Sequence, residues 1–337
     1  MLQYLEESVD VTNAHKELQD TLRKVFKRKV VKNIGHPGGT EYRATLLTDG
    51  KYWFWSRHHR AVHTPRRLNW FGVLGKENDG VSITVEVNTP YKNRNDQASG
   101  FFARDSDTGA IYLLHSGRVG GGATGVGKKH FLAWARCEGW LEAEALDSRG
   151  KLRTGLIVMP ISGVGAARSA VRYIELVRRF KIVAKAGGLH GASFRNQLKR
   201  YNDYYAEGRG RRKGVRKSNI DYISRHGEIV DALFDWRKFR PTPYRSRIVK
   251  DVLLDLGVLV GGELREVFEV KTSAHRQAVY GALGQLLVHG SAKNCRRVIV
   301  LPKGEPIKKD IALAFERLKI KVLRFSLKKD SVVILDD

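Results

Sequence analysis

Residues 253–273 read LLDLGVLVGGELREVFEVKTS, and this stretch decides the fold of the C-terminal third of the chain. Two runs of β-forming residues meet at Gly261-Gly262, which is the pattern of a β-hairpin with a two-residue turn. Side chains alternate across a strand, so we expect Glu269 and Lys271 on one face. With the turn at this glycine pair, Asp255 falls level with Glu269 or close to it. The sequence therefore predicts two carboxylates and a lysine at one edge of a sheet.

Such a group of side chains suits the hydrolysis of phosphodiesters. Asp255 and Glu269 offer the hard oxygen ligands that Mg²⁺ prefers, and a bound metal polarises a phosphoryl group and lowers the pKa of a water. Lys271 can orient that water or stabilise charge that develops on the phosphate. Burial of three charges without a metal or a partner would be costly. We therefore expect a catalytic centre that uses Mg²⁺, with Mn²⁺ as a substitute.

The segments around the hairpin predict a domain of helices and strands over residues 219–337. Apolar residues at helical spacing or in short β-rich runs define each segment. The expected elements are a helix in DYISRHGEIVDALFDWRKF before the hairpin, then a helix in RQAVYGALGQLLVHG, a strand in RRVIVLP, a helix in IKKDIALAFERLKI and a strand in KVLRFSL.

The pattern Asp255…Glu269-Val270-Lys271-Thr272-Ser273 resembles the PD-(D/E)XK signature of the restriction-endonuclease-like nuclease superfamily. The resemblance covers about 220–330 and implies an αβββαβ-type core with a central mixed sheet. It also implies that the aspartate and the glutamate hold Mg²⁺ while the lysine assists the attacking water. The helix that carries Tyr280 and Gln285 is similar to the helix after the ExK strand in many members, which implies that Gln285 contacts the site. The alternative for Gln285 is a role in helix packing.

Three positions leave the ligand set open. Leu254 stands where the family signature has proline, so Asp251 is the competitor of Asp255 as the metal ligand. Glu228, on the preceding helix, resembles an extra acidic residue that some members place near the metal. Its alternative is an ordinary solvated helix charge.

The composition of the whole chain favours a polyanionic partner. The 337 residues carry 61 Lys and Arg against 35 Asp and Glu, a formal net charge of +26. Phosphate neutralisation makes nucleic acid the expected partner, because the sequence has neither a basic amphipathic helix nor a lipidation signal for a membrane. Cys137 and Cys295 lack a CxxC partner, which suits a reducing cytoplasm and offers no zinc site. The acidic N-terminus is no signal peptide, and no apolar run approaches a membrane span.

Residues 1–186 predict a strand-rich α+β domain, with helices at about 12–30 and 166–187. We expect this domain to recognise DNA, because aromatic and basic residues are interleaved in KYWFWSRHHRAVHTPRRLNWFG. Basic groups can hold phosphates while aromatic rings stack on bases, and a pocket of such rings would suit a flipped, modified base. The alternative is that alternate aromatics form the core of strands. The candidate contacts are Trp55, Arg57, Arg60, Arg66 and Arg67.

Two other segments are candidate phosphate contacts. Residues 122–128 match GxxxxGK, but Lys129 stands where a P-loop has Ser or Thr, so we expect no nucleotide cofactor. Lys128 and Lys129 would instead contact nucleic-acid phosphates, with a flexible turn as the alternative. Residues 187–218 are polar and strongly basic and predict a linker or arm between the domains. The arm residues that we expect to contact DNA are Arg209, Arg211 and Arg212.

These patterns together predict a two-domain, Mg²⁺-dependent DNA endonuclease of restriction type. Residues 1–186 would recognise specific, including modified, DNA, and residues 219–337 would cleave it. Cutting both strands takes two active sites, so we expect a homodimer. The alternatives are a structure-specific repair nuclease with the same centre, a non-catalytic nucleic-acid-binding protein with a vestigial nuclease fold, and an RNA-binding protein.

Overall fold

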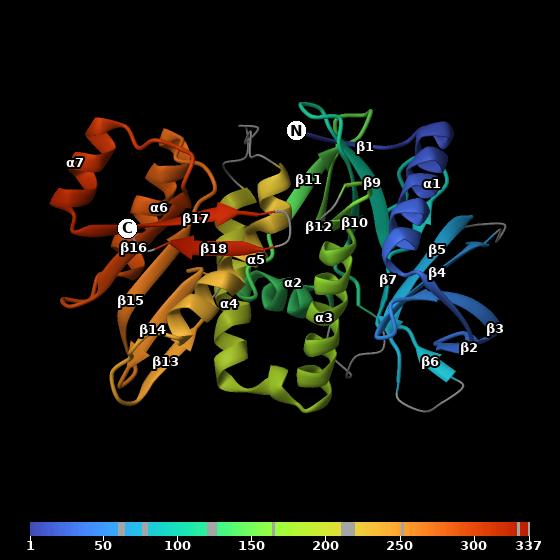
Figure 1. Cartoon of the computed structure of the whole chain (residues 1–337), viewed down its shortest axis with the longest axis horizontal. Helices are drawn as coiled ribbons and strands as arrows, with labels where there is room; N and C mark the ends of the chain where they lie inside the picture. Colours follow the sequence, from blue (N-terminus) through green and yellow to red (C-terminus); the bar gives the residue numbers. More distant parts are fainter. Residues whose placement is uncertain are drawn as a thin grey trace. The chain divides into compact units, whose positions relative to one another are not determined.

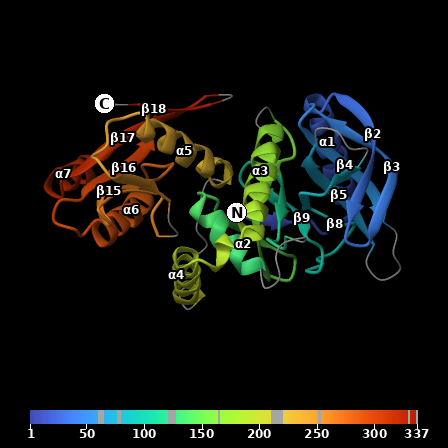
Figure 2. The same cartoon turned by 90° about the horizontal axis from the view of Figure 1, so that it is seen from below.

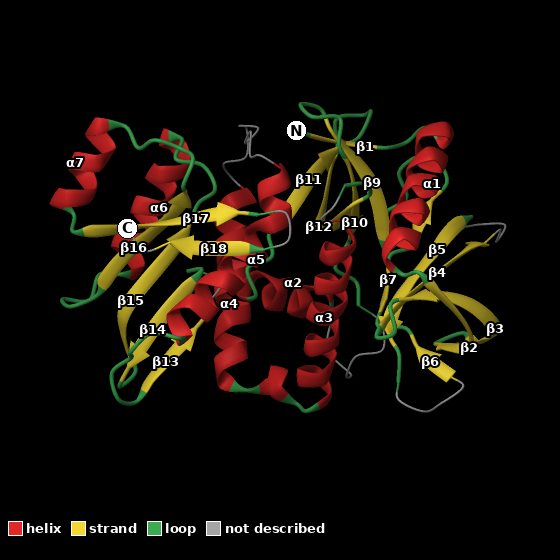
Figure 3. Cartoon of the chain, viewed as in Figure 1, coloured by secondary structure: helices red, strands yellow, loops and turns green. Residues whose placement is uncertain are grey.

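The computed structural model describes residues 1–59, 65–75, 80–119, 127–163, 166–209, 220–250, 253–328 and 331–335. Within these ranges the protein combines helices with three sheets, each of which mixes parallel and antiparallel pairs (Figure 1, Figure 3). The mixed α/β and α+β class expected from the sequence is therefore present. None of the described helices is both long and apolar enough to cross a membrane.

The described residues fall into two compact units that interleave along the chain. Neither unit is a single continuous segment, because short pieces near residues 133 and 196 group with the C-terminal part. The first unit comprises Met1–Leu132, Glu142–Arg195 and Arg212–Ser224, and the second comprises Ala133–Leu141, Asn196–Arg211 and Arg225–Asp337.

Among the described residues, the first unit contains a small closed barrel and a twisted sheet. Rings and aliphatic side chains such as Tyr4, Phe101 and Ile157 fill the barrel. The barrel order is β1 (Leu2–Tyr4), β11 (Glu142–Leu146), β12 (Leu152–Pro160), β10 (Ile111–His115) and β9 (Gly100–Asp105). The sheet order is β6 (Gly80–Ser82), β2 (Arg28–His36), β3 (Gly39–Thr48), β4 (Tyr52–His59), β5 (Arg66–Val73) and β7 (Val85–Glu86), and β8 (Thr89–Pro90) also pairs with β5.

The helix expected at residues 12–30 lies earlier, in α1 (Ser8–Val25). Its buried residues follow helical spacing only as far as Leu22, and the β-branched pair Val30-Val31 then belongs to strand β2. The helix expected at 166–187 is α3 (Ala166–Lys185), which packs against β12. The remaining helical elements up to the second sheet are α2 (Lys128–Cys137), the 3₁₀ turn η1 (Gly188–His190), α4 (Ala192–Arg209) and α5 (Ile220–Lys238).

Helix α4 occupies much of the segment that the sequence predicts as a linker, 187–218. Phe194 and Tyr201 are buried, and their spacing of seven residues places them on one helix face. The glycines and cations around these two residues dominate the local composition, which is why the sequence pattern does not indicate a helix. The basic run at 210–219 lies outside the described residues.

The described strands of the second unit form one mixed sheet. Strands β15, β16 and β17 are parallel to one another, and the flanking strands are antiparallel to their neighbours. The two edge strands, β13 and β18, are short and were not expected from the sequence. The order is β13 (Ser246–Val249), β14 (Leu256–Val260), β15 (Glu263–Val270), β16 (Arg296–Pro302), β17 (Ile320–Leu327) and β18 (Val332–Leu335).

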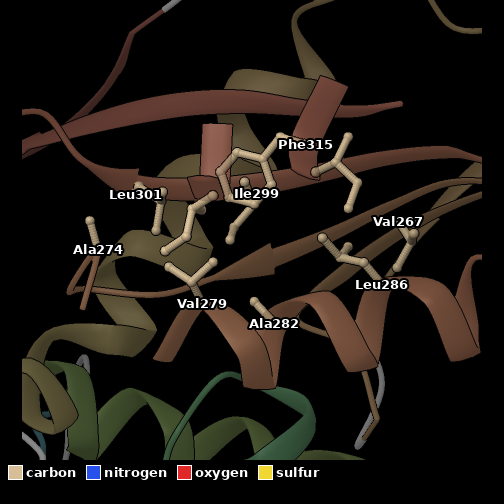
Figure 4. Packing of buried hydrophobic residues seen from close by; sticks show 10 residues of the cluster. Val267, Ala274, Val279, Ala282, Leu286, Ile299, Leu301 and Phe315 are labelled. Carbon is tan, nitrogen blue, oxygen red and sulfur yellow. The ribbon is translucent and has the colours of Figure 1, made fainter. Parts of the chain in front are cut away.

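Helices cover both faces of this sheet (Figure 2). On one face, α6 (Arg276–His289) and α7 (Lys309–Arg317) pack their apolar residues against alternate positions of β15, β16 and β17 (Figure 4). On the other face, Trp236 of α5 meets Phe268 of β15 edge to face, with 6.4 Å between ring centroids. Because Val267 and Phe268 serve opposite faces, Glu269 points to the same side as Val267, toward α6.

Candidate active site

The hairpin of β14 and β15 turns at the glycine pair, as the sequence predicts. Gly261 and Gly262 have φ angles of 60° and 89°, a left-handed conformation that glycine adopts without steric cost. A bulge between Val258 and Leu259 shifts the register by one residue, so that Leu256 pairs with Phe268. Continued by one step, this register sets Asp255 level with Glu269. The bulge therefore aligns the two carboxylates on one face.

Asp255 is held by donors on both oxygens. It is only 8% exposed, and its Oδ2 accepts a 2.8 Å hydrogen bond from the backbone N–H of Val270. Nε2 of His226, on α5, lies 3.4 Å from Oδ1. Burial alone would raise the pKa of Asp255, but His226, Lys271 and Arg136 outweigh it and hold that pKa well below its usual range. Asp255 is therefore a carboxylate at neutral pH.

The surroundings of Glu269 shift its pKa in the opposite direction from that of Asp255. It is 2% exposed, and burial together with the charge of Asp255 raises its pKa to about 7, although the ammonium of Lys271 acts to lower it. Nζ of Lys271 donates to Oε1 of Glu269 at 2.6 Å and to Oε1 of Gln285 at 3.1 Å. The structure thus brings together the four residues expected at the centre: Asp255, Glu269, Lys271 and Gln285.

Two further residues at this site were not expected from the sequence. Nδ1 of His226 lies 2.8 Å from the carbonyl oxygen of Gly139, so both ring nitrogens face oxygen atoms. Arg136, near the end of α2, lowers the pKa of both Asp255 and Glu269 through its positive charge. Both belong to the second unit, although Arg136 and Gly139 lie far upstream of the hairpin. No sequence motif identifies them, because only the tertiary fold brings them to the hairpin.

The other candidates around the centre are placed differently. Glu228 is buried and pairs with Arg225 at 3.0 Å, so it is not the solvated helix charge considered as its alternative. The residue of α5 that reaches Asp255 is His226, two positions earlier. The hydroxyl of Tyr280 accepts a 2.7 Å hydrogen bond from Arg276 at the surface. Asp251, the competitor of Asp255, lies outside the described residues.

The centre suits a hard divalent cation. Among the described residues, no three His, Cys, Asp or Glu side chains are grouped as a preformed metal site. Mg²⁺, however, commonly binds through one or two carboxylates and keeps several waters. Asp255 and Glu269 are both buried and lie level across the hairpin, so a cation between them would relieve the repulsion that contributes to the raised pKa of Glu269. Asp255 and Glu269 are the residues that would hold it.

In the first unit, Trp55 lies in the core rather than on the surface. It is buried in a cluster with Trp53 and Trp70, and its ring is 4.7 Å from that of Trp70. Phe54 and Phe71 pack together on the other side of the same strands, 4.9 Å apart. The five Trp and Phe residues of β4 and β5 are therefore core residues, and stacking on a base would require Trp55 to leave that core.

The basic residues of β4 and β5 lie at the ends of these strands. Arg57 is exposed and pairs with Glu41. Arg67 is half-buried, donating to Oγ of Ser56 at 3.0 Å and lying 2.6 Å from Nε2 of His58. Arg66 is also half-buried, and its Nε is buried without a hydrogen-bond partner among the described residues. These three arginines remain candidate DNA contacts.

The remaining candidates are only partly described. Lys128 and Lys129 are exposed in the first turn of α2. Arg209 is the last residue of α4, and nothing is described of its side chain. Arg60, Arg211 and Arg212 lie outside the described residues, as do residues 122–126 of the glycine-rich loop.

Comparison of this chain with models of protein families, with curated proteins and with solved structures finds no match. The function of the centre therefore has to be argued from its own residues. The decisive feature is a pair of buried carboxyl groups beside a lysine, at the end of a hairpin whose register sets them level.

Proposed function

We propose that the chain is a Mg²⁺-dependent DNA endonuclease of restriction type, with a PD-(D/E)XK centre formed by Asp255, Glu269 and Lys271. The observation that carries this proposal is the burial of two carboxyl groups beside one ammonium. Such burial costs free energy, and replacement of buried charges by apolar residues is often stabilising. A catalytic role explains why the charges are kept.

The order of elements supports the same proposal. Helix α5, strands β13, β14 and β15, helix α6 and strand β16 follow one another as αβββαβ. This is the order that the resemblance to the restriction-endonuclease-like superfamily implies. Strand β13, which the sequence pattern does not indicate, completes it.

Asp255 and Glu269 would hold the cation. When bound, Mg²⁺ would polarise the phosphoryl oxygens and lower the pKa of the attacking water. His226 and the backbone N–H of Val270 fix the orientation of Asp255, so the carboxylate needs little rearrangement before it binds. The field of Lys271 and Arg136 favours the ionised form of both carboxyl groups.

The hydrogen bonds of Lys271 indicate that it can also contact the water or the substrate. An ammonium has three N–H donors, and Glu269 and Gln285 take two of them. Among the described residues, no further partner takes the third. That donor can hold the attacking water or an oxygen of the scissile phosphate, where negative charge develops during hydrolysis. Gln285 positions Lys271 by accepting one of its hydrogen bonds.

The net charge of +26 supports DNA as the substrate, and the first unit as its recognition part. The exposed or half-buried arginines at the ends of β4 and β5 would contact phosphates. Because hydrolysis of both strands needs two centres, we propose that two copies act together on the DNA.

The proposal is tested by cleavage of supercoiled plasmid with Mg²⁺, using unmodified and base-modified DNA in parallel. Wild type should cut, and Lys271→Ala and Glu269→Gln should cut about 10³-fold more slowly while still binding DNA. Glu263→Gln is the matched control, because Glu263 lies on the same strand but pairs with Arg265 at the surface. Cleavage by Lys271→Ala at the wild-type rate would remove this centre from consideration. Preference for flaps or mismatches over intact duplex would indicate a repair nuclease instead.

A further inference from the structure

The loop between α5 and β13 exposes two large aromatic side chains. Phe239 is 84% exposed and Tyr244 is 85% exposed, higher than any other large hydrophobic residue that the structure describes. A single exposed apolar residue is common, but two rings in one seven-residue loop form a surface that water solvates poorly. Burial of these rings would require a ligand.

The charges of this loop indicate which kind of ligand it fits. Between Asp235 and Asp251 the sequence has six basic residues and no acidic one. Lys238, Arg245 and Arg247 are exposed, and the guanidinium of Arg245 lies 5.4 Å from the ring centroid of Tyr244. The carboxylates of Glu263 and Glu266, on β15, are paired with arginines. Aromatic rings flanked by unopposed cations are the features of a surface that binds unpaired nucleic acid.

The loop is anchored to the sheet at its base. Arg237 is buried and donates from Nε and Nη2 to the two carboxylate oxygens of Glu266, at 2.7 and 3.0 Å. Its Nη1 donates to the carbonyl oxygens of Arg240 and Pro241, both at 3.3 Å. Pro241 and Pro243 fix their own φ angles. The exposed rings therefore lie on a loop with a defined conformation, and binding would order few additional groups.

The position of the loop relates it to the catalytic centre of the same unit. Ser246, directly after the loop, pairs with Val260 beside the glycine turn, whereas Val249 pairs with Gly257 near Asp255. The loop therefore lies at the other end of the hairpin from the carboxylates. At about 3.3 Å a residue, this separation is roughly 17 Å, or about five base steps of DNA.

We infer that Phe239 and Tyr244 stack on the bases of an unpaired DNA segment, and that the cations beside them hold its phosphates. The inference rests on the proposed function, because it assumes that the second unit acts on DNA. A second copy of this chain is the less suitable occupant, because a two-fold interface would set the exposed cations Lys238, Arg245 and Arg247 against their own copies. The loop would thus hold bases that become unpaired near the scissile phosphate of a duplex substrate.

The test measures binding apart from cleavage, with the full-length protein in EDTA. A labelled oligothymidylate of about 15 nucleotides is titrated and followed by fluorescence anisotropy. Phe239→Ala/Tyr244→Ala should bind it between about tenfold and a hundredfold more weakly. The loss should persist at high salt, because stacking releases no counterions. Leu313→Ala, an exposed apolar residue of α7 in the same unit, is the control and should bind like wild type.

The cations are tested separately. Arg245→Gln/Arg247→Gln should lower the slope of log affinity against log salt by about 0.7 for each phosphate that is no longer neutralised. Both rings are highly exposed, so all variants should unfold at the wild-type temperature. Unchanged binding by the aromatic double variant would overturn the inference. So would a change from dimer to monomer in sedimentation with unchanged binding, because the loop would then be a self-association surface.

The outcome separates this inference from the nuclease proposal. If the aromatic double variant loses single-strand affinity but the wild-type protein cuts no DNA, the inference about the loop is supported and the nuclease proposal is rejected. If the aromatic double variant binds single strands with wild-type affinity and cleavage depends on Lys271, the inference about the loop is rejected and the nuclease proposal stands.

Discussion

Two hairpins, one in each unit, carry the residues that first suggested a function, and they bury opposite kinds of side chain. The hairpin of β4 and β5 buries Trp53, Trp55 and Trp70 and leaves its arginines at the strand ends. The hairpin of β14 and β15 buries Asp255 and Glu269. Burial of an indole is favourable in any fold, whereas burial of a carboxylate costs free energy. The second hairpin is therefore the stronger functional signal, although its motif is the shorter one.

The largest expected effect concerns Trp55. Trp55→Ala should lower the free energy of unfolding of the first unit by about 3–5 kcal/mol, because the cavity left beside Trp70 cannot close fully. At temperatures where the variant is folded, its DNA affinity should match that of wild type. Chemical denaturation and anisotropy measure the two quantities. A stable variant that has lost DNA affinity would show that the indole contacts DNA and would break the comparison.

The second expected effect is a pH dependence of opposite sign in the two units. The pKa of Glu269 is raised from 4.5 to about 7, so without metal the folded second unit binds the extra proton. The contribution of Glu269 to stability is then fully present below pH 4.5 and falls by at most about 3 kcal/mol as the pH rises through 7. In the first unit, burial lowers the pKa of His15 and of His115 from 6.5 to about 3. Its stability is present above pH 6.5 and falls on acidification.

Hydrogen exchange measured by mass spectrometry separates the two units in one sample. With EDTA, amides of β15 should exchange faster at pH 8 than at pH 5.5 after correction for intrinsic rates. Mg²⁺ should remove most of this difference, and so should Glu269→Gln. Barrel strands β9 and β10 should instead lose protection below pH 6.5. The same pH response in both units would contradict the assignment of these buried groups.

A smaller effect is expected from the histidine behind Asp255. His226→Gln replaces the imidazole that faces Oδ1 of Asp255 by a more flexible amide, and residues that orient a metal ligand typically contribute ten- to a hundredfold. Cleavage should fall by about that factor, and the Mg²⁺ concentration for half-maximal rate should rise. His36→Gln, in the first unit, is the control. A rate loss without a change in Mg²⁺ dependence would assign His226 to structure alone.

The smallest effect is expected at Arg57. Arg57→Gln should weaken DNA binding only a few-fold and lower the salt slope by about 0.9, the amount for one duplex phosphate. Its stability should stay within about 0.5 kcal/mol of wild type, because the pair with Glu41 is at the surface. An unchanged salt slope would mean that this end of the β4–β5 hairpin does not touch DNA.

Local patterns predicted those elements whose hydrophobic period is clear. Strand β16 and helix α6 lie within a residue or so of their expected positions, and the turn at Gly261-Gly262 follows from its two glycines. Edge strands β13 and β18 are only half-buried, so their sequences lack the strong apolar signal of a central strand. Helix α4 was not predicted, because charged residues outnumber the two buried rings in the described part of this helix.

Only those features of the candidate site that depend on neighbouring residues in the sequence could be predicted. Glu269 and Lys271 share a face by alternation, but their alignment with Asp255 depends on the bulge at Val258 and Leu259, which no residue type marks. His226 and Arg136 come from helices that the tertiary fold brings to the hairpin. The aromatic stretch of the first unit failed as a surface prediction because composition does not distinguish an exposed ring from a buried one.

The second unit is assembled from separate pieces of the chain, and this limits how gene segments that encode it can be exchanged. Residues 133–141 supply Arg136 and the carbonyl of Gly139, and a Cβ at Gly139 would meet Cβ of Val230 at 3.1 Å. A gene fragment that starts at α5 would encode both carboxylates and the lysine but leave His226 without its carbonyl partner. A C-terminal fragment that starts at α5 would therefore not contain the complete second unit. Recombination that exchanges the first unit would have to replace segments on both sides of residues 133–141 and keep those residues in place.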